Sequence, residues 1–244
     1  MTINERFLEY VREAFRAYLQ SGTSRSPKKL TPLHSAIAAD LEALYGPDFT
    51  VKSIGHGDGK EAKICGRYHQ KAVDITILKG EKPVAGYAVK FVVRNYKQNS
   101  VNYFENMLGE TANIRSTAVP YFQLFIIFDR IPHYDNHGFL QKYEKISPHN
   151  LEKYLALSKD DPSVYYHTPD KTLVAILHLN EPETEYFATN GKEYSQSYLS
   201  VIDDRGLLGY TQRTGDPFDE SVIYNDYEDF IQRTYYIAMG KLKK

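Results

Sequence analysis

Two residue types that can support hydrolytic chemistry lie close together in the sequence: Asp74 in the run AVDITIL and Lys90 in the run AVKF. A carboxylate is a preferred ligand of hard divalent cations. A lysine beside such a cation can orient or help to deprotonate a water molecule, or offset charge that develops on a phosphate under attack. An Asp on one strand, with a second acid and a Lys two residues apart on the next strand, is the minimum set for metal-assisted cleavage of a phosphodiester.

The alternation of apolar and polar residues predicts the strands that carry these groups, at 72–78 and 84–93. If the two strands are neighbours, Asp74 and Lys90 converge at one edge of a sheet. The second acid is missing, because Ala88 lies two residues before Lys90 and shares its face. This gap is the main open question in the sequence.

The rest of the chain supplies the elements that must position this pair. A helix at 3–20 has an apolar stripe, and a second helix, from Thr31 or Pro32 to Tyr45, begins with a proline in its first turn. The run YFQLFIIF at 121–128 predicts a strand buried on both faces. The remaining elements are expected as strands at 49–54, 62–69, 172–179 and 198–201, helices from about 100, at 151–157 and at 221–239, a loop-rich insertion at 130–147 and an irregular segment at 181–197.

Length and composition favour one globular unit. The chain has 244 residues, 42% of them hydrophobic, which is enough for a sizeable core. The formal net charge of −1 gives no domain-wide basic surface, so any contact with nucleic acid must use a local patch. The single cysteine excludes an internal disulfide and a cysteine-based zinc cluster. The absence of a long apolar run and of a leader pattern favours a cytoplasmic protein without a membrane partner.

Residues 31–128 resemble the PD-(D/E)XK nuclease superfamily and, within it, the type II restriction endonucleases. The resemblance rests on Asp74 in AVDITIL, on Lys90 in AVKF, and on the run NYKQNSVNYFENMLGETANIR, which is similar to the helix after the catalytic strand of some restriction enzymes. It implies a Mg²⁺-dependent, sequence-specific endonuclease that cuts double-stranded DNA. A homodimer is expected, since palindromic sites match two-fold symmetry.

The resemblance also assigns roles to residues. Asp74 would bind Mg²⁺, the carbonyl of Val89 would add a backbone ligand, and Lys90 would poise the attacking water. Three explanations of Ala88 compete. The first is that the missing acid lies on the following helix, where Glu105 is fifteen residues after Lys90. The second is that alanine replaces a native acid. The third is that the protein binds DNA without cutting it. On the first explanation Glu105 is preferred to Glu110, because Glu105 borders the apolar stripe of a helix that starts near residue 100.

Polar residues between the catalytic strand and its helix are candidates for DNA contact, since Arg, Lys, Asn and Gln grip phosphates and read purine edges. These candidates are Arg94, Asn95, Lys97, Gln98, Asn99 and Asn102. Less specific candidates are Arg205 and Arg213 in a glycine-rich stretch, and Glu42, which is near the end of the second helix.

The sequence thus predicts an α/β fold with a mixed central β-sheet flanked by helices and a C-terminal elaboration of strands and loops. One nuclease domain would cover 1–244, with a catalytic core at 31–128 and a recognition or dimerisation part at 129–244. Two other functions remain open: a catalytically inactive DNA-binding or regulatory module with a nuclease fold, and a nuclease that acts on RNA or single strands as a defence effector.

Overall fold

The computed structural model describes residues 1–21, 30–181, 188–212 and 215–243. It is an α/β fold built on a mixed seven-stranded sheet, as predicted. The strand order is β1 (Thr50–Ser53), β4 (Ile75–Lys79), β5 (Lys82–Val92), β6 (Tyr121–Phe128), β9 (Lys171–Leu179) and β10 (Leu208–Tyr210), with β11 (Val222–Tyr224) also pairing with β9. The strands β5, β6 and β9 are parallel, and β1, β4 and β10 are antiparallel to their neighbours.

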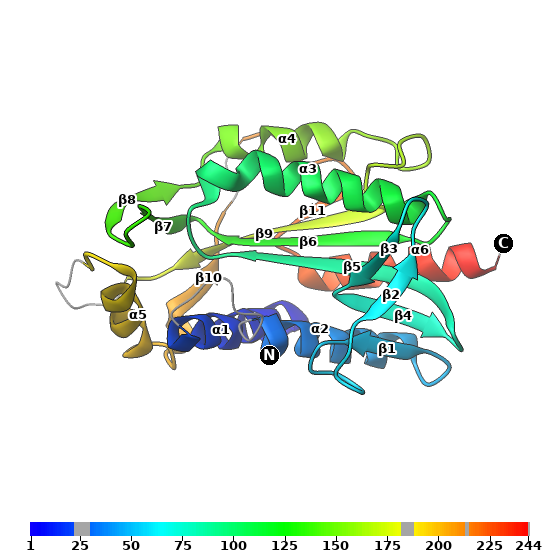
Figure 1. Ribbon diagram of the computed structural model, residues 1–244, viewed down its shortest axis with the longest axis horizontal. Coiled ribbons are helices and arrows are strands. Elements are labelled where there is room, and N and C mark those ends of the chain that lie inside the picture. The colour runs from blue at the N-terminus through cyan, green and yellow to red at the C-terminus, as the bar shows by residue number, and fades with distance from the viewer. Residues whose placement is uncertain (22–29, 182–187, 213–214, 244) are drawn as a thin grey trace.

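Helices cover both faces of this sheet (Figure 1). One layer holds α3 (Tyr96–Arg115) and α4 (Pro148–Ser158). The other holds α1 (Ile3–Ser21), α2 (Leu30–Tyr45) and α6 (Tyr227–Leu242). Every residue of β6 is buried, which is the reason for its continuous apolar sequence. The hydroxyl of Tyr87 on β5 bonds Tyr45 of α2 and Thr234 of α6, so three elements are joined below the sheet.

A small hairpin breaks away from the main sheet beside Asp74. Strands β2 (Ala62–Cys65) and β3 (Gln70–Val73) pair with each other, and β4 then enters the main sheet. Asp74 is the single residue between β3 and β4. The strand predicted at 72–78 is therefore two strands that belong to different sheets, bent at the position of the candidate ligand.

Several predicted elements have different structures. The prediction of a loop-rich insertion at 130–147 is wrong, because β7 (Arg130–Tyr134) and β8 (Leu140–Lys145) form a hairpin. The Asp135 carboxylate closes the turn of this hairpin by accepting hydrogen bonds from the backbone N–H groups of residues 137 and 139. The prediction of a strand at 198–201 is also wrong, since α5 (Gly191–Leu199) extends into this region. Asn190 caps the N-terminus of α5. A short 3₁₀ turn, η2 (Arg205–Leu207), precedes β10. The helix predicted at 221–239 is β11 followed by α6, which Asp226 caps.

Helix α3 starts four residues earlier than expected. Asn95 adopts the left-handed conformation (φ 51°), which ends the extended chain after β5 and starts the helix at Tyr96. The C-terminal half of the chain also completes the central sheet, because β9 lies between β6 and β10.

Candidate functional site

A cleft of about 430 Å³ lies between β5, β6 and α3. We call it the β5 cleft. Its charged lining residues are Lys71, Asp74, Lys90 and Glu110. Strand β4 pairs with β5 only as far as Tyr87, so Asp74 lies beside the strand just before Lys90. Asp74 and Lys90 thus line one cleft, as expected, and they do so beside β5, an interior strand of the sheet.

Asp74 is held in place by the backbone on both sides. The N–H of Val89 donates to its carboxylate over 2.7 Å, and the hydroxyl of Ser53 donates to its carbonyl over 2.7 Å. Burial raises the pKa of the Asp74 carboxyl to about 6; the Val89 N–H lowers this pKa, and Glu110 raises it. A carboxylate so destabilised in its charged form gains most from a bound cation.

Lys90 reaches over the cleft from the next strand. Its amine is 4.3 Å from the centroid of the Tyr103 ring on α3, within range of a cation–π contact. Burial of the amine lowers the Lys90 pKa, while Glu110 and Asp74 raise it. A lysine with a lowered pKa is better able to exchange a proton with water near neutral pH.

The acid that α3 contributes to the cleft is Glu110 and not the preferred Glu105. The cleft-facing residues of α3 are Tyr103, Asn106, Met107 and Glu110, which follow helical spacing. Glu105 is exposed and outside this set. The preference for Glu105 assumed a helix start at residue 100, and it fails because the helix turns a different face to the sheet. Glu110 forms a 2.5 Å ion pair with Lys71 of β3.

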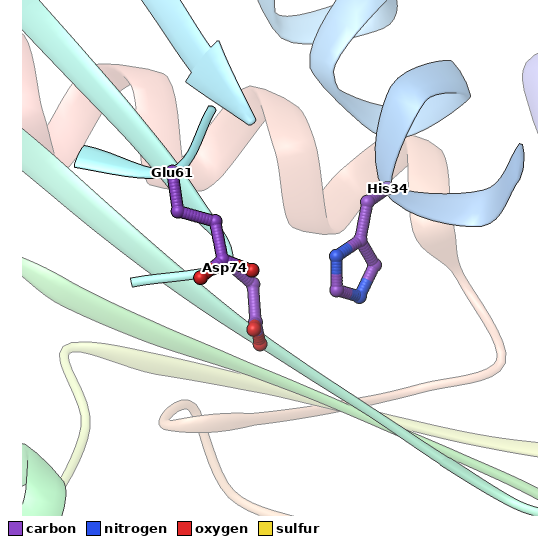
Figure 2. Close-up of side chains that lie close together, drawn as sticks. All are labelled: His34, Glu61 and Asp74. Carbon is purple, nitrogen blue, oxygen red and sulfur yellow. The ribbon is translucent and has the colours of Figure 1, made fainter. Parts of the chain in front are cut away.

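A group of potential metal ligands adjoins the cleft. One donor atom from each of His34, Glu61 and Asp74 lies within 4.8 Å of the others. Figure 2 shows the three side chains lying close together, with His34 coming from α2 and the two acids from the region of the β2–β3 hairpin. We refer to these residues as the three-ligand cluster.

His34 fits a ligand role because its polar atoms have no other use. The residue is 1% exposed, and neither ring nitrogen has a hydrogen-bond partner in the described part of the chain. Burial lowers the pKa of His34 to about 4, so the imidazole is neutral at pH 7 and can offer a lone pair. Unpartnered buried polar groups are costly, and a bound cation would remove the cost.

Two members of the cluster, His34 and Glu61, were not predicted from the sequence. His34 lies on the buried face of α2, among Leu33, Ile37 and Leu41. A titratable residue within an apolar stripe was the available signal. Glu61 has no comparable signal, since it directly precedes β2 after a glycine-rich turn. Its pKa is raised, first by burial and then by Asp74.

Ala88 lines the same cleft, yet its methyl group belongs to a small apolar cluster with Ile64, Val73, Ile114 and Tyr121. No carboxylate can come from this position. Glu61 lies where an acid can complement Asp74, although it comes from another segment. Tyr121 also lines the cleft, and its buried hydroxyl has no partner among the described residues. Burial raises the pKa of this hydroxyl, and Glu110 and Asp74 raise it further.

The predicted DNA-contact segment after β5 divides into different surroundings. Asn95 has a structural role: its amide donates to the carbonyl of Tyr134 and accepts from the Tyr134 N–H. Asn99 donates to the Asn95 carbonyl, and the backbone N–H of Lys97 donates to Glu144. The side chains of Lys97, Gln98 and Asn102 are exposed, and Arg94 lines a second pocket outside the cleft. None of these six residues lines the β5 cleft.

The less specific candidates are also outside the cleft. Glu42 lies 3.4 Å from Nε2 of His56, and Arg205 is exposed in η2. Arg213 falls outside the described residues. The carbonyl of Val89 as a metal ligand stays a prediction, although Val89 lines the cleft.

Comparisons with known proteins identify no relative: no family model, no curated protein and no solved structure matches this chain. Among the helices of the described segments, none has the length and apolar character needed to span a bilayer.

Proposed function

We propose that this protein is a divalent-metal-dependent nuclease whose centre is the three-ligand cluster. The observation that carries the proposal is the meeting of His34, Glu61 and Asp74 within 4.8 Å beside Lys90. One neutral imidazole and two carboxylates form a reasonable donor set for a divalent cation with open positions for water and substrate. When bound, the cation would neutralise charge on the phosphate and lower the pKa of a water molecule.

The residues of the β5 cleft then have distinct tasks. Lys90 would orient the attacking water or accept its proton, which its lowered pKa favours. The Tyr121 hydroxyl, which has no partner among the described residues, would donate to a substrate oxygen. Glu110 and Lys71, joined as an ion pair, would fix the electrostatic environment of Asp74.

The donor set bears on which metal is used. Mg²⁺ prefers oxygen ligands and near-octahedral geometry, whereas imidazole suits later divalent ions better. We propose that both Mg²⁺ and Mn²⁺ are bound, with Mn²⁺ bound more tightly because of His34. Asp74 and Glu61 alone would give no such preference.

As the substrate we propose double-stranded DNA cut at specific sites, as expected for the restriction enzymes that residues 31–128 resemble. The Asp–Lys geometry of the β5 cleft supports this proposal. A homodimer on palindromic sites belongs to the same proposal. The exposed residues Lys97, Gln98 and Asn102 remain candidates for contacts outside the cleft.

A second substrate, single-stranded nucleic acid or RNA, is favoured by one observation. Tyr68, Tyr165 and Tyr166 are exposed. The backbone of Tyr68 bonds Asn113 and that of Tyr165 bonds Arg115, so these rings gather at the same end of α3. Exposed tyrosines can stack on unpaired bases but not on bases inside a duplex.

A digestion assay tests both proposals. Supercoiled plasmid, linear duplex, single-stranded DNA and RNA are incubated with the full chain in Mn²⁺, in Mg²⁺ or in excess chelator. Discrete duplex fragments support the site-specific enzyme, and degradation of only single strands or RNA supports the second substrate. Absence of metal-dependent cleavage of all four substrates contradicts the nuclease proposal.

A further inference from the structure

A second pocket, of about 460 Å³, lies away from the three-ligand cluster. It is formed where the end of α1, the segment after β5, the β7–β8 hairpin and the start of α5 meet, and we call it the basic pocket. Its lining residues include Gln20, Arg94, Tyr134, Gly191, Lys192 and Gln196.

Among the described residues, the two charged side chains that line the basic pocket are both cations. Arg94 and Lys192 have no ion-pair partner among the described residues, and no acid lines the pocket with them. The Arg94 guanidinium lies 6.0 Å from the centroid of the Tyr134 ring, which helps to hold it at the pocket wall. An anion bound in the pocket could pair with both cations.

A buried hydroxyl in the same wall independently points to a ligand. Tyr134 is 4% exposed, and its hydroxyl has no hydrogen-bond partner among the described residues. The ring carbon that carries this hydroxyl lies 3.9 Å from the position of a Cβ on Gly191, so the polar end of the ring is beside a lining residue. A ligand oxygen would supply the missing acceptor.

The polar groups favour a phosphate over a carboxylate or a metal ion. A guanidinium, an ammonium and a phenol donate from several directions, which matches the several acceptor oxygens of a phosphate. The second and third amides of α5, those of Lys192 and Glu193, already donate to the Asn190 side chain, so they are not free to donate to a ligand. The side-chain amides of Gln20 and Gln196 can bond whatever the phosphate carries.

We propose that the basic pocket binds a phosphate group, with Arg94 and Lys192 as its cationic ligands and Tyr134 as a neutral donor. The phosphate can belong to a free mononucleotide or to the end of a nucleic-acid strand. The proposal does not rest on the nuclease function, because the described residues that line the basic pocket are all different from those that line the β5 cleft.

The test is calorimetric titration of the full chain in chelator, where cleavage does not occur. The probes are inorganic phosphate, adenosine 5′-monophosphate, and a short single-stranded DNA with and without a 5′-phosphate. Saturable binding of the phosphorylated probes, weakened about tenfold or more in Arg94→Gln and in Lys192→Gln, is expected. The control variant Lys82→Gln, which changes an exposed cation outside the pocket, should bind as the wild type does.

Two further variants keep the test decisive if a substitution disturbs folding. Arg94→Lys retains the charge and should restore part of the affinity. Tyr134→Phe removes only the unpartnered hydroxyl, so it should weaken phosphate binding without lowering the melting temperature. Tighter binding of the mononucleotide identifies a free ligand, and tighter binding of the 5′-phosphorylated strand identifies a strand end. The proposal is overturned if no phosphate probe binds, or if Arg94→Gln and Lys192→Gln bind as tightly as the wild type.

Discussion

The β5 cleft and the basic pocket are of similar size, about 430 and 460 Å³, but they differ in charge. Asp74, Glu110, Lys71 and Lys90 bring both signs into the cleft, with His34 and Glu61 beside it. Among the described residues, the charged groups that line the basic pocket are Arg94 and Lys192, both cations. The β5 cleft is lined by residues of β5, and the basic pocket by Arg94 in the segment directly after β5. The same strand therefore positions both Lys90 and Arg94.

This difference in charge indicates a difference in chemistry. A site that activates water on a phosphate needs groups that hold a cation together with a group that handles a proton. A site that only holds a phosphate needs cations and donors without a competing carboxylate. Variants that change the activity of the β5 cleft without changing binding in the basic pocket, or the reverse, therefore test this difference.

The largest effect is expected for Asp74→Asn. Loss of one carboxylate charge from the three-ligand cluster should reduce metal-dependent cleavage by more than about a hundredfold, since changes to residues that merely support a ligand already cost up to that much. Initial rates of plasmid cleavage measure the effect. Phosphate binding in the basic pocket should be unchanged, and a parallel loss there would show that the two hollows are coupled.

Lys90→Met is expected to lower the cleavage rate by about a hundredfold, the smaller end of the range for a group that transfers a proton. Methionine keeps much of the aliphatic volume against Tyr103. Because Lys90 is not in the three-ligand cluster, metal-induced stabilisation against heat should persist. Cleavage by this variant at the wild-type rate would show that Lys90 has no part in catalysis.

The pair Glu110→Gln and Glu105→Gln gives a smaller but sharper contrast. Glu110 lines the cleft and pairs with Lys71, whereas Glu105 is exposed on the same helix. We expect a loss of about tenfold in cleavage rate for Glu110→Gln, comparable to other supporting residues, and no change for Glu105→Gln. A larger loss for Glu105→Gln than for Glu110→Gln would support Glu105 as the site residue, as the sequence predicted.

These two glutamates show how much of the site can be predicted from the sequence. Alternation predicted extended chain on both sides of Asp74 and around Lys90, and their meeting follows from the pairing of β4 with β5. The choice between Glu105 and Glu110 depends on which face of α3 packs on the sheet, and the buried residues Met107, Thr111 and Ile114 define that face. The recruitment of Glu61 depends on the bend at Asp74, which local pattern does not encode. His34 was visible only as a polar residue in a buried stripe.

The last expected effect concerns the stability of the metal-free protein and not its activity. The folded-state pKa of Asp74, about 6, is above its ordinary value of 3.8, so folding favours the protonated form. Stability from this group is present below pH 4 and is lost as the pH rises through 6. Asp74→Asn should thus stabilise the metal-free protein above pH 7 by about 1–3 kcal/mol, and the gain should vanish near pH 4.

Denaturant unfolding in chelator at a series of pH values gives this difference. Comparison of the variant with the wild type removes the contribution of His34, whose depressed pKa acts in the opposite direction. A gain that is constant with pH would mean that the charge of Asp74 is not its cause.

Titration of the full chain with Mn²⁺, followed by calorimetry, tests the central claim most directly. The wild type should give a saturable isotherm, weakened by at least about tenfold in Glu61→Gln and in His34→Leu, and unchanged in Glu105→Gln. His34→Leu should remain folded, because it replaces an unpartnered buried imidazole with an apolar side chain. No saturable binding by the wild type, or equal binding by His34→Leu, would contradict a metal centre at His34, Glu61 and Asp74.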